Sequence, residues 1–186
     1  MKKIILFSAA MAMLATTFMS CKKDSPAPVV TMPVQTSFVK TLLTGQTIET
    51  VNLTYELGVT FKSSVKGNIK SLKVNVPQTG NYRVTLWKVS DHSIVATNTV
   101  TCTTINSWNN TLAVNIPIEA DTEYILSTNC TKYYRFSAPA GTFPYTHGYV
   151  TLINYRGNSG LSQTFPASAY GALCYGFVDF NFQRSL

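Results

Sequence analysis

Eight acidic residues are the first candidates for chemistry, because a glycosidase needs two carboxylates that face each other across a cleft. They are Asp24, Glu49, Glu56, Asp91, Glu119, Asp121, Glu123 and Asp179. Glu56 and Asp179 fall in strand-like segments, and no spacing pairs them. Glu119, Asp121 and Glu123 bracket one turn, where they either bind calcium or are solvated, and the spacing of an EF-hand is absent. We expect no catalytic carboxylate pair.

The histidines and the short motifs also argue against a catalytic or metal site. His92 and His147 are the two histidines, and His92 falls in an expected turn. The chain has no HxH, HExxH or CxxC spacing of the kind that zinc sites use. It also lacks the GxSxG turn of serine hydrolases and a glycine-rich phosphate loop. The sequence therefore predicts no metal, no cofactor and no enzymatic activity.

Three cysteines, Cys102, Cys130 and Cys174, alternate in phase with the apolar residues of their segments. All three are therefore expected to point inward, where cysteine behaves as a small apolar residue. Export favours oxidation, so one disulfide is the alternative. An odd number leaves at least one thiol free, and sequence does not give the pairing.

The fourth cysteine, Cys21, follows a segment that resembles the leader of a bacterial lipoprotein. The chain starts with MKK, and Ile4–Phe18 is mostly apolar and carries no charge, which is the order of a secretory signal. We expect residues 1–20 to be removed and Cys21 to be acylated, which anchors the protein in the lipid bilayer. The alternative is ordinary cleavage with a free Cys21, which the bulky Phe18 disfavours.

Residues 21–36 form the expected lipidated N-terminus and tether. This segment contains several prolines and shows no periodicity, which is typical of a linker. Lys22, Lys23 and Asp24 resemble residues that direct lipoproteins to the outside of the outer membrane, or they are a solvated spacer. We expect an outer-membrane lipoprotein on the periplasmic or the cell-surface side.

Charge argues against a nucleic-acid partner. After removal of the leader the chain has 13 basic and 8 acidic residues, a net charge of +5. The lysines are scattered, and no run of five basic residues occurs, so the basic patch of nucleic-acid-binding proteins is missing. We expect no nucleic acid to bind.

Residues 37–186 read as one domain of short strands, in which apolar and polar residues alternate. The segments expected to be strands are 38–43, 56–61, 72–76, 83–89, 94–102, 112–118, 124–128 and 175–182. Turn residues separate them, at Gln78–Asn81 and Ser90–Ser93 for example. This spacing predicts a single antiparallel β-sandwich of the jelly-roll or Ig-like kind, with little or no helix outside the leader.

Several stretches together resemble the bacterial domain of unknown function 4082 family. They are YELGVTF (55–61), GNIKSLKV (67–74), TGNYRVTLW (79–87), SIVATNTV (93–100), SWNNTLAVNIPIEADTEYILS (107–127) and YGFVDFNF (175–182). The resemblance implies an extracellular β-sandwich module that often occurs beside carbohydrate-related domains. It implies no established enzymatic activity.

Aromatic residues supply the candidate binding face. Trp87 is expected in the core, whereas Trp108 starts a strand and is expected to be partly exposed. Residues 133–155 are rich in aromatic residues and turns, and loops on a rigid scaffold often carry binding sites. The candidate ligand-binding residues are Trp108, Tyr145, His147, Tyr149, Tyr155 and Arg156.

Tyr145, His147 and Tyr149 alternate, so we expect them on one face of a strand. Their rings would either stack on a sugar or cover the end of the sandwich as packing. We therefore expect a non-enzymatic, lipid-anchored binding module for glycan or another extracellular polymer. The alternative is a structural protein that contacts another envelope protein.

Overall fold

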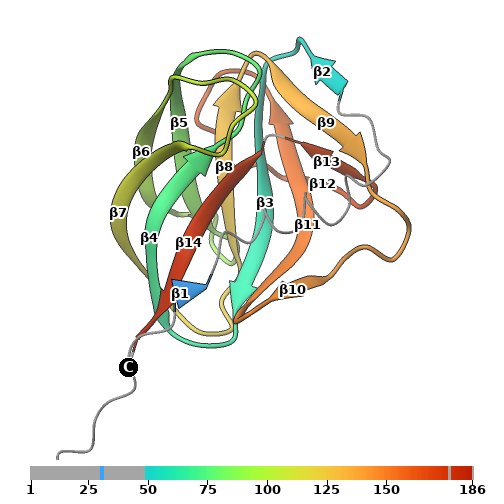
Figure 1. Ribbon diagram of the computed structural model, residues 1–186. Coiled ribbons are helices and arrows are strands. Elements are labelled where there is room, and N and C mark those ends of the chain that lie inside the picture. The colour runs from blue at the N-terminus through green and yellow to red at the C-terminus, as the bar shows by residue number, and fades with distance from the viewer. Residues whose placement is uncertain (1–29, 32–48, 176, 186) are drawn as a thin grey trace, which may run out of the picture.

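The protein folds as an antiparallel β-sandwich. The computed structural model describes residues 30–31, 49–175 and 177–185, and within these residues every regular element is a strand (Figure 1). The described part of the chain contains no helix long and apolar enough to cross a bilayer. The predicted fold class is confirmed.

The larger layer is a sheet with the strand order β10-β11-β3-β8-β5-β6, to which β12 adds by pairing with β11. Its strands are β3 (Tyr55–Ser63), β5 (Gly80–Lys88), β6 (Ile94–Cys102), β8 (Tyr124–Cys130), β10 (Tyr145–His147), β11 (Val150–Ser159) and β12 (Ser168–Tyr170). All of the pairings are antiparallel.

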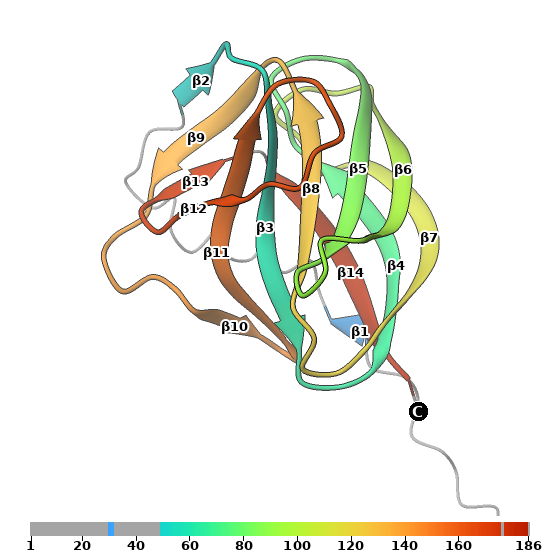
Figure 2. The ribbon, with the colours of Figure 1, turned by 180° about the vertical axis from the view of Figure 1, so that it is seen from behind.

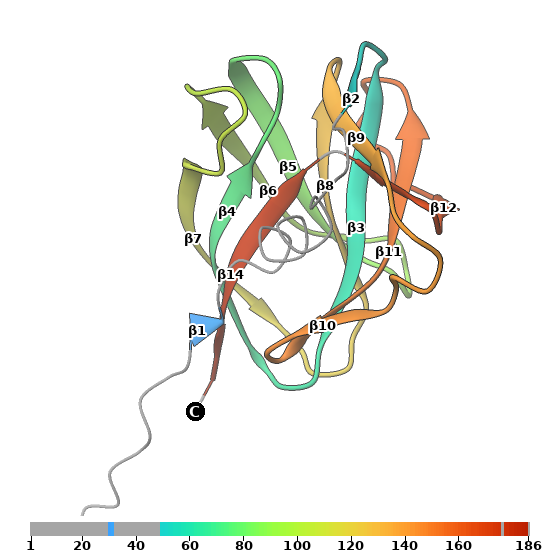
Figure 3. The ribbon, with the colours of Figure 1, turned by 45° about the vertical axis from the view of Figure 1, so that its right-hand side comes forward.

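The facing layer is a four-stranded sheet with the order β1-β14-β4-β7. Its strands are β1 (Val30–Thr31), β4 (Gly67–Val74), β7 (Asn110–Ile118) and β14 (Val178–Arg184). Figure 3 shows the two layers from the side, with β4 and β14 on one side and β3 and β8 on the other. The core lies between them, where the Phe61 and Phe180 rings pack with centroids 4.4 Å apart.

A three-stranded sheet lies at one end of the sandwich, in the order β13-β9-β2. Its strands are β2 (Glu49–Val51), β9 (Tyr133–Ser137) and β13 (Leu173–Tyr175). β9 is the central strand and follows β8 after two residues, so the small sheet lies close to the start of β3 (Figure 1).

Residues 160–167, which connect β11 to β12, are here called the covering segment. They cross the outer face of the larger sheet (Figure 2). Arg83 Nη2 donates to the Leu161 carbonyl oxygen at 3.3 Å. Gln163 Nε2 donates to Thr85 Oγ1 at 3.1 Å and to Thr97 Oγ1 at 2.7 Å. Phe165 packs edge-on against Trp87, which is buried as expected, although under this segment and outside the space between the sheets.

The alternation of apolar residues predicted most strands correctly. The segment expected at 94–102 is β6, and Leu57, Val59 and Phe61 of β3 are all buried. The single strand expected at 175–182 is wrong, because β13 ends at Tyr175 and β14 begins at Val178. The strand expected at 38–43 lies outside the described residues.

The inward direction of the cysteines is confirmed. Cys102, Cys130 and Cys174 are buried, and all three are free thiols. Burial raises the pKa of Cys130 to about 12, and burial also raises the pKa of Cys174 to about 12. These thiols are therefore protonated packing groups at neutral pH.

Candidate functional site

Four tyrosines surround a hollow of about 160 Å³ at the end of the sandwich that the small sheet covers. They are Tyr55 of β3, Tyr133 of β9, Tyr170 of β12 and Tyr175 of β13. Arg135, Leu53, Leu57 and Leu173 complete the lining. We call this hollow the tyrosine cleft.

Strand pairing explains why these side chains meet. Tyr175 lies directly opposite Arg135 in the β13–β9 pair, and Tyr133 is two residues before Arg135 on β9. These three residues therefore share one face of the small sheet, because directly paired residues and residues i and i+2 point the same way. Tyr55 and Leu57 share the inner face of β3 in the same manner.

The tyrosine rings meet edge to face. The Tyr55 and Tyr133 centroids are 6.0 Å apart, and the Tyr170 and Tyr175 centroids are 5.3 Å apart, with interplanar angles of 79° and 77°. The Tyr175 ring also contacts the buried Tyr155 ring at 5.8 Å. Aromatic rings prefer this geometry, so the walls of the cleft support each other.

This packing leaves the Tyr175 hydroxyl without a hydrogen-bond partner in the described part of the chain. Tyr175 is 4% exposed, and its hydroxyl oxygen has no hydrogen-bond partner among the described residues. A buried polar group without a partner is costly, and a native structure rarely leaves one without a reason. A bound molecule that offers a hydrogen bond would remove this cost.

The cleft keeps its phenols uncharged. Burial raises the pKa of Tyr175 well above its ordinary value, and the neighbouring phenols of Tyr170, Tyr133 and Tyr55 raise it further. Burial likewise raises the pKa of Tyr133, and the Tyr55 phenol adds to the rise. The neutral phenol both donates and accepts hydrogen bonds, so the cleft suits a neutral polar ligand.

Gly157 of β11 makes room for one wall of the cleft. A Cβ atom at this position would lie 2.8 Å from Leu57 Cδ2 and 3.6 Å from Tyr170 Cε2. Both of those side chains line the cleft. The absence of a side chain at Gly157 therefore helps to set the shape of the hollow.

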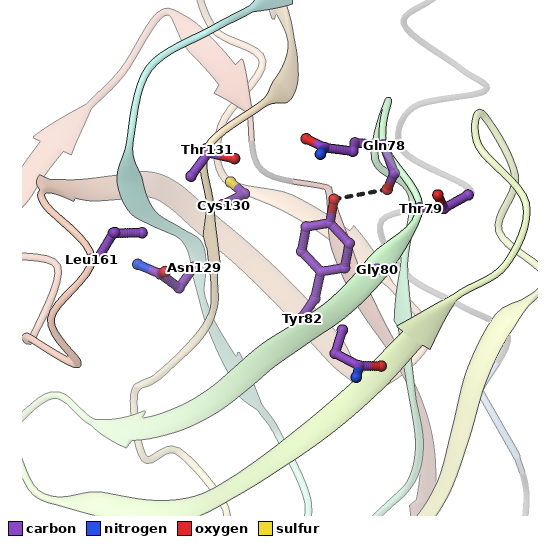
Figure 4. A pocket seen from close by; sticks show the side chains of 9 residues that line it. Gln78, Thr79, Gly80, Tyr82, Asn129, Cys130, Thr131 and Leu161 are labelled. Atoms are coloured by element: carbon purple, nitrogen blue, oxygen red, sulfur yellow. Dashed lines mark hydrogen bonds between the residues drawn. The ribbon is translucent and has the colours of Figure 1, made fainter.

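A second hollow, of about 300 Å³, lies at the turn before β5 (Figure 4). The side chains of Tyr82, Asn81 and Asn129 are hydrogen-bonded within the protein. Tyr82 donates its hydroxyl hydrogen to the Gln78 carbonyl oxygen at 2.7 Å, and Asn81 Oδ1 accepts from Thr101 at 2.9 Å (Figure 4 draws the first of these). Asn129 Nδ2 donates to the Tyr55 and Gly160 carbonyl oxygens. This hollow is therefore a weaker candidate for a ligand site than the tyrosine cleft.

The buried Glu56 carboxylate forms a hydrogen bond and an ion pair with neighbouring side chains. It is 0% exposed, accepts from Ser127 Oγ at 2.5 Å and pairs with Arg83 Nη2 at 2.9 Å. Burial raises the pKa of Glu56, and the hydrogen bonds from Ser127 and Arg83 oppose the rise. Glu56 alternates with Tyr55 and Leu57 on β3, so it points away from the tyrosine cleft.

The structure brings Tyr145 and His147 together on β10, but the expectation that Tyr149 continues their strand is wrong. β10 ends at His147, and Gly148 reverses the chain with a φ of 60°. Tyr149 therefore lies in the turn before β11. Its hydroxyl accepts from Arg184 Nη1 at 3.2 Å, and the Arg184 guanidinium lies 5.8 Å from its ring centroid.

The other expected site residues lie elsewhere. Trp108 is half-buried and stacks on Phe177 with centroids 6.0 Å apart. Tyr155 is 0% exposed and belongs to the core, so it offers no ring to a ligand at the surface. Arg156 donates through Nη1 to the Ala167 carbonyl oxygen at 3.4 Å, which ties it to the covering segment.

Sequence reasoning missed Tyr55, Arg135, Tyr170 and Tyr175. Tyr55 and Tyr175 are the first residues of two stretches that carry the family resemblance, and this was the one signal that could have found them. Tyr170 and Arg135 carried none, because their role depends on the pairing of β12 with β11 and of β13 with β9.

No group of three or more His, Cys, Asp or Glu side chains within the described ranges is arranged to hold a metal ion. Cys21, the expected lipidation site, lies outside those ranges.

Comparisons with known proteins identify the family. No curated protein matches the chain. Among solved structures, it is similar to the infectious bursal disease virus VP2 subviral particle, with 12% sequence identity and a TM-score of 0.27. That match covers 95% of this chain but 46% of the viral chain, so this chain spans about half the length of that relative. Residues 43–176 match the family described as "Domain of unknown function (DUF4082)", and the chain belongs to this family.

Proposed function

We propose that the protein is a lipid-anchored, non-enzymatic binding module of the bacterial envelope, and that the tyrosine cleft binds a glycan or another extracellular polymer. The observation that carries this proposal is the buried, unpartnered hydroxyl of Tyr175, a residue that lines an aromatic hollow. An aromatic hollow with a few placed polar groups is the usual form of a small-molecule site.

Sugars fit the chemistry of this hollow. A sugar ring carries C–H groups that pack on aromatic rings and hydroxyls that exchange hydrogen bonds. Tyrosine meets both needs, because its ring is apolar and its tip is polar. The four tyrosines of the cleft place several such groups around one small volume.

The lipid anchor and the position of the Glu56 carboxylate complete the proposal. The leader-like sequence before Cys21 supports attachment to the outer membrane through acyl chains. Glu56, the fully buried glutamate, is engaged by Ser127 and Arg83 on the other face of β3, away from the cleft. The cleft therefore binds without the help of this carboxylate.

A matched pair of variants tests the proposal. Tyr170 and Tyr145 are both half-buried tyrosines on three-residue strands that pair with β11, but only Tyr170 lines the cleft. The full chain in detergent is applied to an array of immobilised polysaccharides. We expect binding by the parent, about tenfold weaker binding by Tyr170→Ala, and unchanged binding by Tyr145→Ala.

Two results would count against the proposal. If the parent binds none of the polysaccharides, the glycan function is wrong. If Tyr145→Ala loses binding while Tyr170→Ala retains it, the site lies at β10. Thermal unfolding of both variants shows whether a loss of binding is a loss of folding.

A second candidate function, assembly with another envelope protein, is favoured by the start of β6. Ile94 and Val95 are 48% and 39% exposed, and β6 pairs with β5 alone among the described strands. An open edge of this kind can accept a strand from a partner. Capture of one envelope protein by the parent, lost in Ile94→Lys, would support this function.

A further inference from the structure

The size and the floor of the tyrosine cleft limit which part of a glycan can enter. The hollow measures about 160 Å³, whereas pockets for drug-sized ligands start at ~300 Å³. Inside the cleft, this space suits one small ring.

The inner end of the cleft is closed. The Tyr175 ring forms part of the lining, and the fully buried Tyr155 ring stands behind it at 5.8 Å. Cys174, the neighbour of Tyr175 on β13, is also fully buried. A ring that enters from the exposed side at Leu53 therefore meets packed side chains at the floor of the cleft.

The polar groups suit a ligand with more than one hydroxyl. The Tyr170 and Tyr133 ring centroids lie 5.3 and 6.3 Å from the Tyr175 centroid, and the Tyr55 centroid lies 6.0 Å from that of Tyr133. A ring with hydroxyls on successive carbons can exchange hydrogen bonds with several of these groups at once.

We propose that the tyrosine cleft binds a single sugar ring at the end of a glycan chain, and that the Tyr175 hydroxyl forms a hydrogen bond with a hydroxyl of that ring. This inference rests on the proposed function and narrows it from a polymer to a chain end. The recognised group is one neutral pyranose ring.

The first test compares ligand length. The probes are methyl glycosides of glucose, galactose, mannose and N-acetylglucosamine, and the di- and trisaccharides that end in the same rings. Calorimetry or NMR titration of the full chain in detergent gives the affinities. We expect at least one methyl glycoside to bind within about threefold of its longer forms, because the further rings lie outside the cleft.

The outcomes separate this inference from the function on which it rests. If affinity rises tenfold or more with each added ring, the site is extended and the inference is wrong, while glycan binding stands. If neither the single rings nor the oligosaccharides bind but a polysaccharide does, the chain-end inference is also wrong. If no glycan of any length binds, both fail.

The second test isolates the hydroxyl. Tyr175→Phe removes a group without a partner in the unliganded protein, so we expect an unchanged or higher melting temperature. Its affinity for the methyl glycoside that binds should fall about two- to tenfold, the worth of one hydrogen bond.

Tyr82→Phe is the matched control, because the Tyr82 hydroxyl donates to the Gln78 carbonyl oxygen outside the tyrosine cleft. This variant should lower the melting temperature and leave the affinity unchanged. If Tyr175→Phe behaves like Tyr82→Phe, the Tyr175 hydroxyl has a partner inside the protein and the inference is overturned.

Discussion

Arg83 Nη2 lies 2.9 Å from Glu56 Oε2, so a partly exposed guanidinium neutralises a carboxylate that is fully buried. The same Arg83 nitrogen donates to the Leu161 carbonyl oxygen of the covering segment. Ser127 links the other Glu56 oxygen to Trp87, whose Nε1 donates to Ser127 Oγ at 2.8 Å. One charged pair therefore joins three strands to the segment above them.

We expect Arg83→Ala to lower the free energy of unfolding at pH 7 by about 2–4 kcal/mol, because it leaves a buried carboxylate without its countercharge. The loss should shrink as pH falls. Burial already raises the pKa of Glu56 above 4.5, whereas the neighbouring Arg83 lowers it. Removal of Arg83 should therefore raise the pKa of Glu56 further.

The sign of this pH dependence follows from proton binding. Where the folded state binds more protons than the unfolded state, stability falls as pH rises. The difference between parent and variant should therefore be small below about pH 4.5 and should grow toward pH 7 in chemical denaturation. Lys66→Ala, which removes an exposed partner of Glu119, is the control and should change little. A pH-independent loss in Arg83→Ala would contradict a buried, charged Glu56.

Gly157→Ala tests the shape of the tyrosine cleft without removing any lining group. The added methyl group would displace Leu57, whose Cδ2 lies 2.8 Å from the new Cβ position. We expect affinity for a bound glycoside to fall at least fivefold, with a stability cost of about 1–3 kcal/mol from overpacking.

Gly171→Ala is the matched control for Gly157→Ala. Gly171 follows Tyr170, and a Cβ atom added there would have no neighbouring atom within 4 Å among the described residues. The affinity of this variant should stay within twofold of the parent. Equal effects from both substitutions would show that the shape of the cleft does not control binding.

The buried cysteines predict slow alkylation. Burial raises the pKa of Cys130 and the pKa of Cys174 to about 12, and burial also raises the pKa of Cys102. At pH 8 the folded Cys21→Ser variant should react with iodoacetamide at least a hundredfold more slowly than the unfolded variant. Mass spectrometry after unfolding without reductant should count three thiols. Rapid modification in the folded state, or one thiol instead of three, would contradict this arrangement.

Cys21→Ser tests the anchor. Acyl chains contribute ~0.8 kcal/mol for each buried CH₂ group, so their loss should release the protein from membranes. Cell fractionation should find the parent with the membranes and the variant in the soluble fraction. Retention of the variant with the membranes would show that Cys21 is not the anchor.

The sequence predicted the sandwich better than it predicted the site, for a physical reason. Alternation within a strand is local, so Leu57, Val59 and Phe61 are recognisable as one face of β3 from their spacing alone. The tyrosine cleft depends on strands that pair across long stretches of chain. Tyr175 meets Arg135 through the β13–β9 register, and no local pattern encodes that pairing.

The expected aromatic site shows the same limit. The density of aromatic residues in 133–155 pointed to a segment that does contribute Tyr133 to the cleft. It could not show that Tyr155 faces the core, because a register shift on β11 between Leu152 and Asn154 changes which residues point inward. Tyr149 was misplaced because Gly148 ends the strand there.

The position of a bound sugar tests the central claim most directly. Backbone amide chemical shifts of the full chain are recorded during titration with the methyl glycoside or oligosaccharide that binds. We predict that the largest changes occur at Tyr55, Tyr133, Tyr170 and Tyr175, which come from four strands and meet only at the cleft. Largest changes at β10, or at the hollow around Tyr82, would contradict the tyrosine cleft as the binding site.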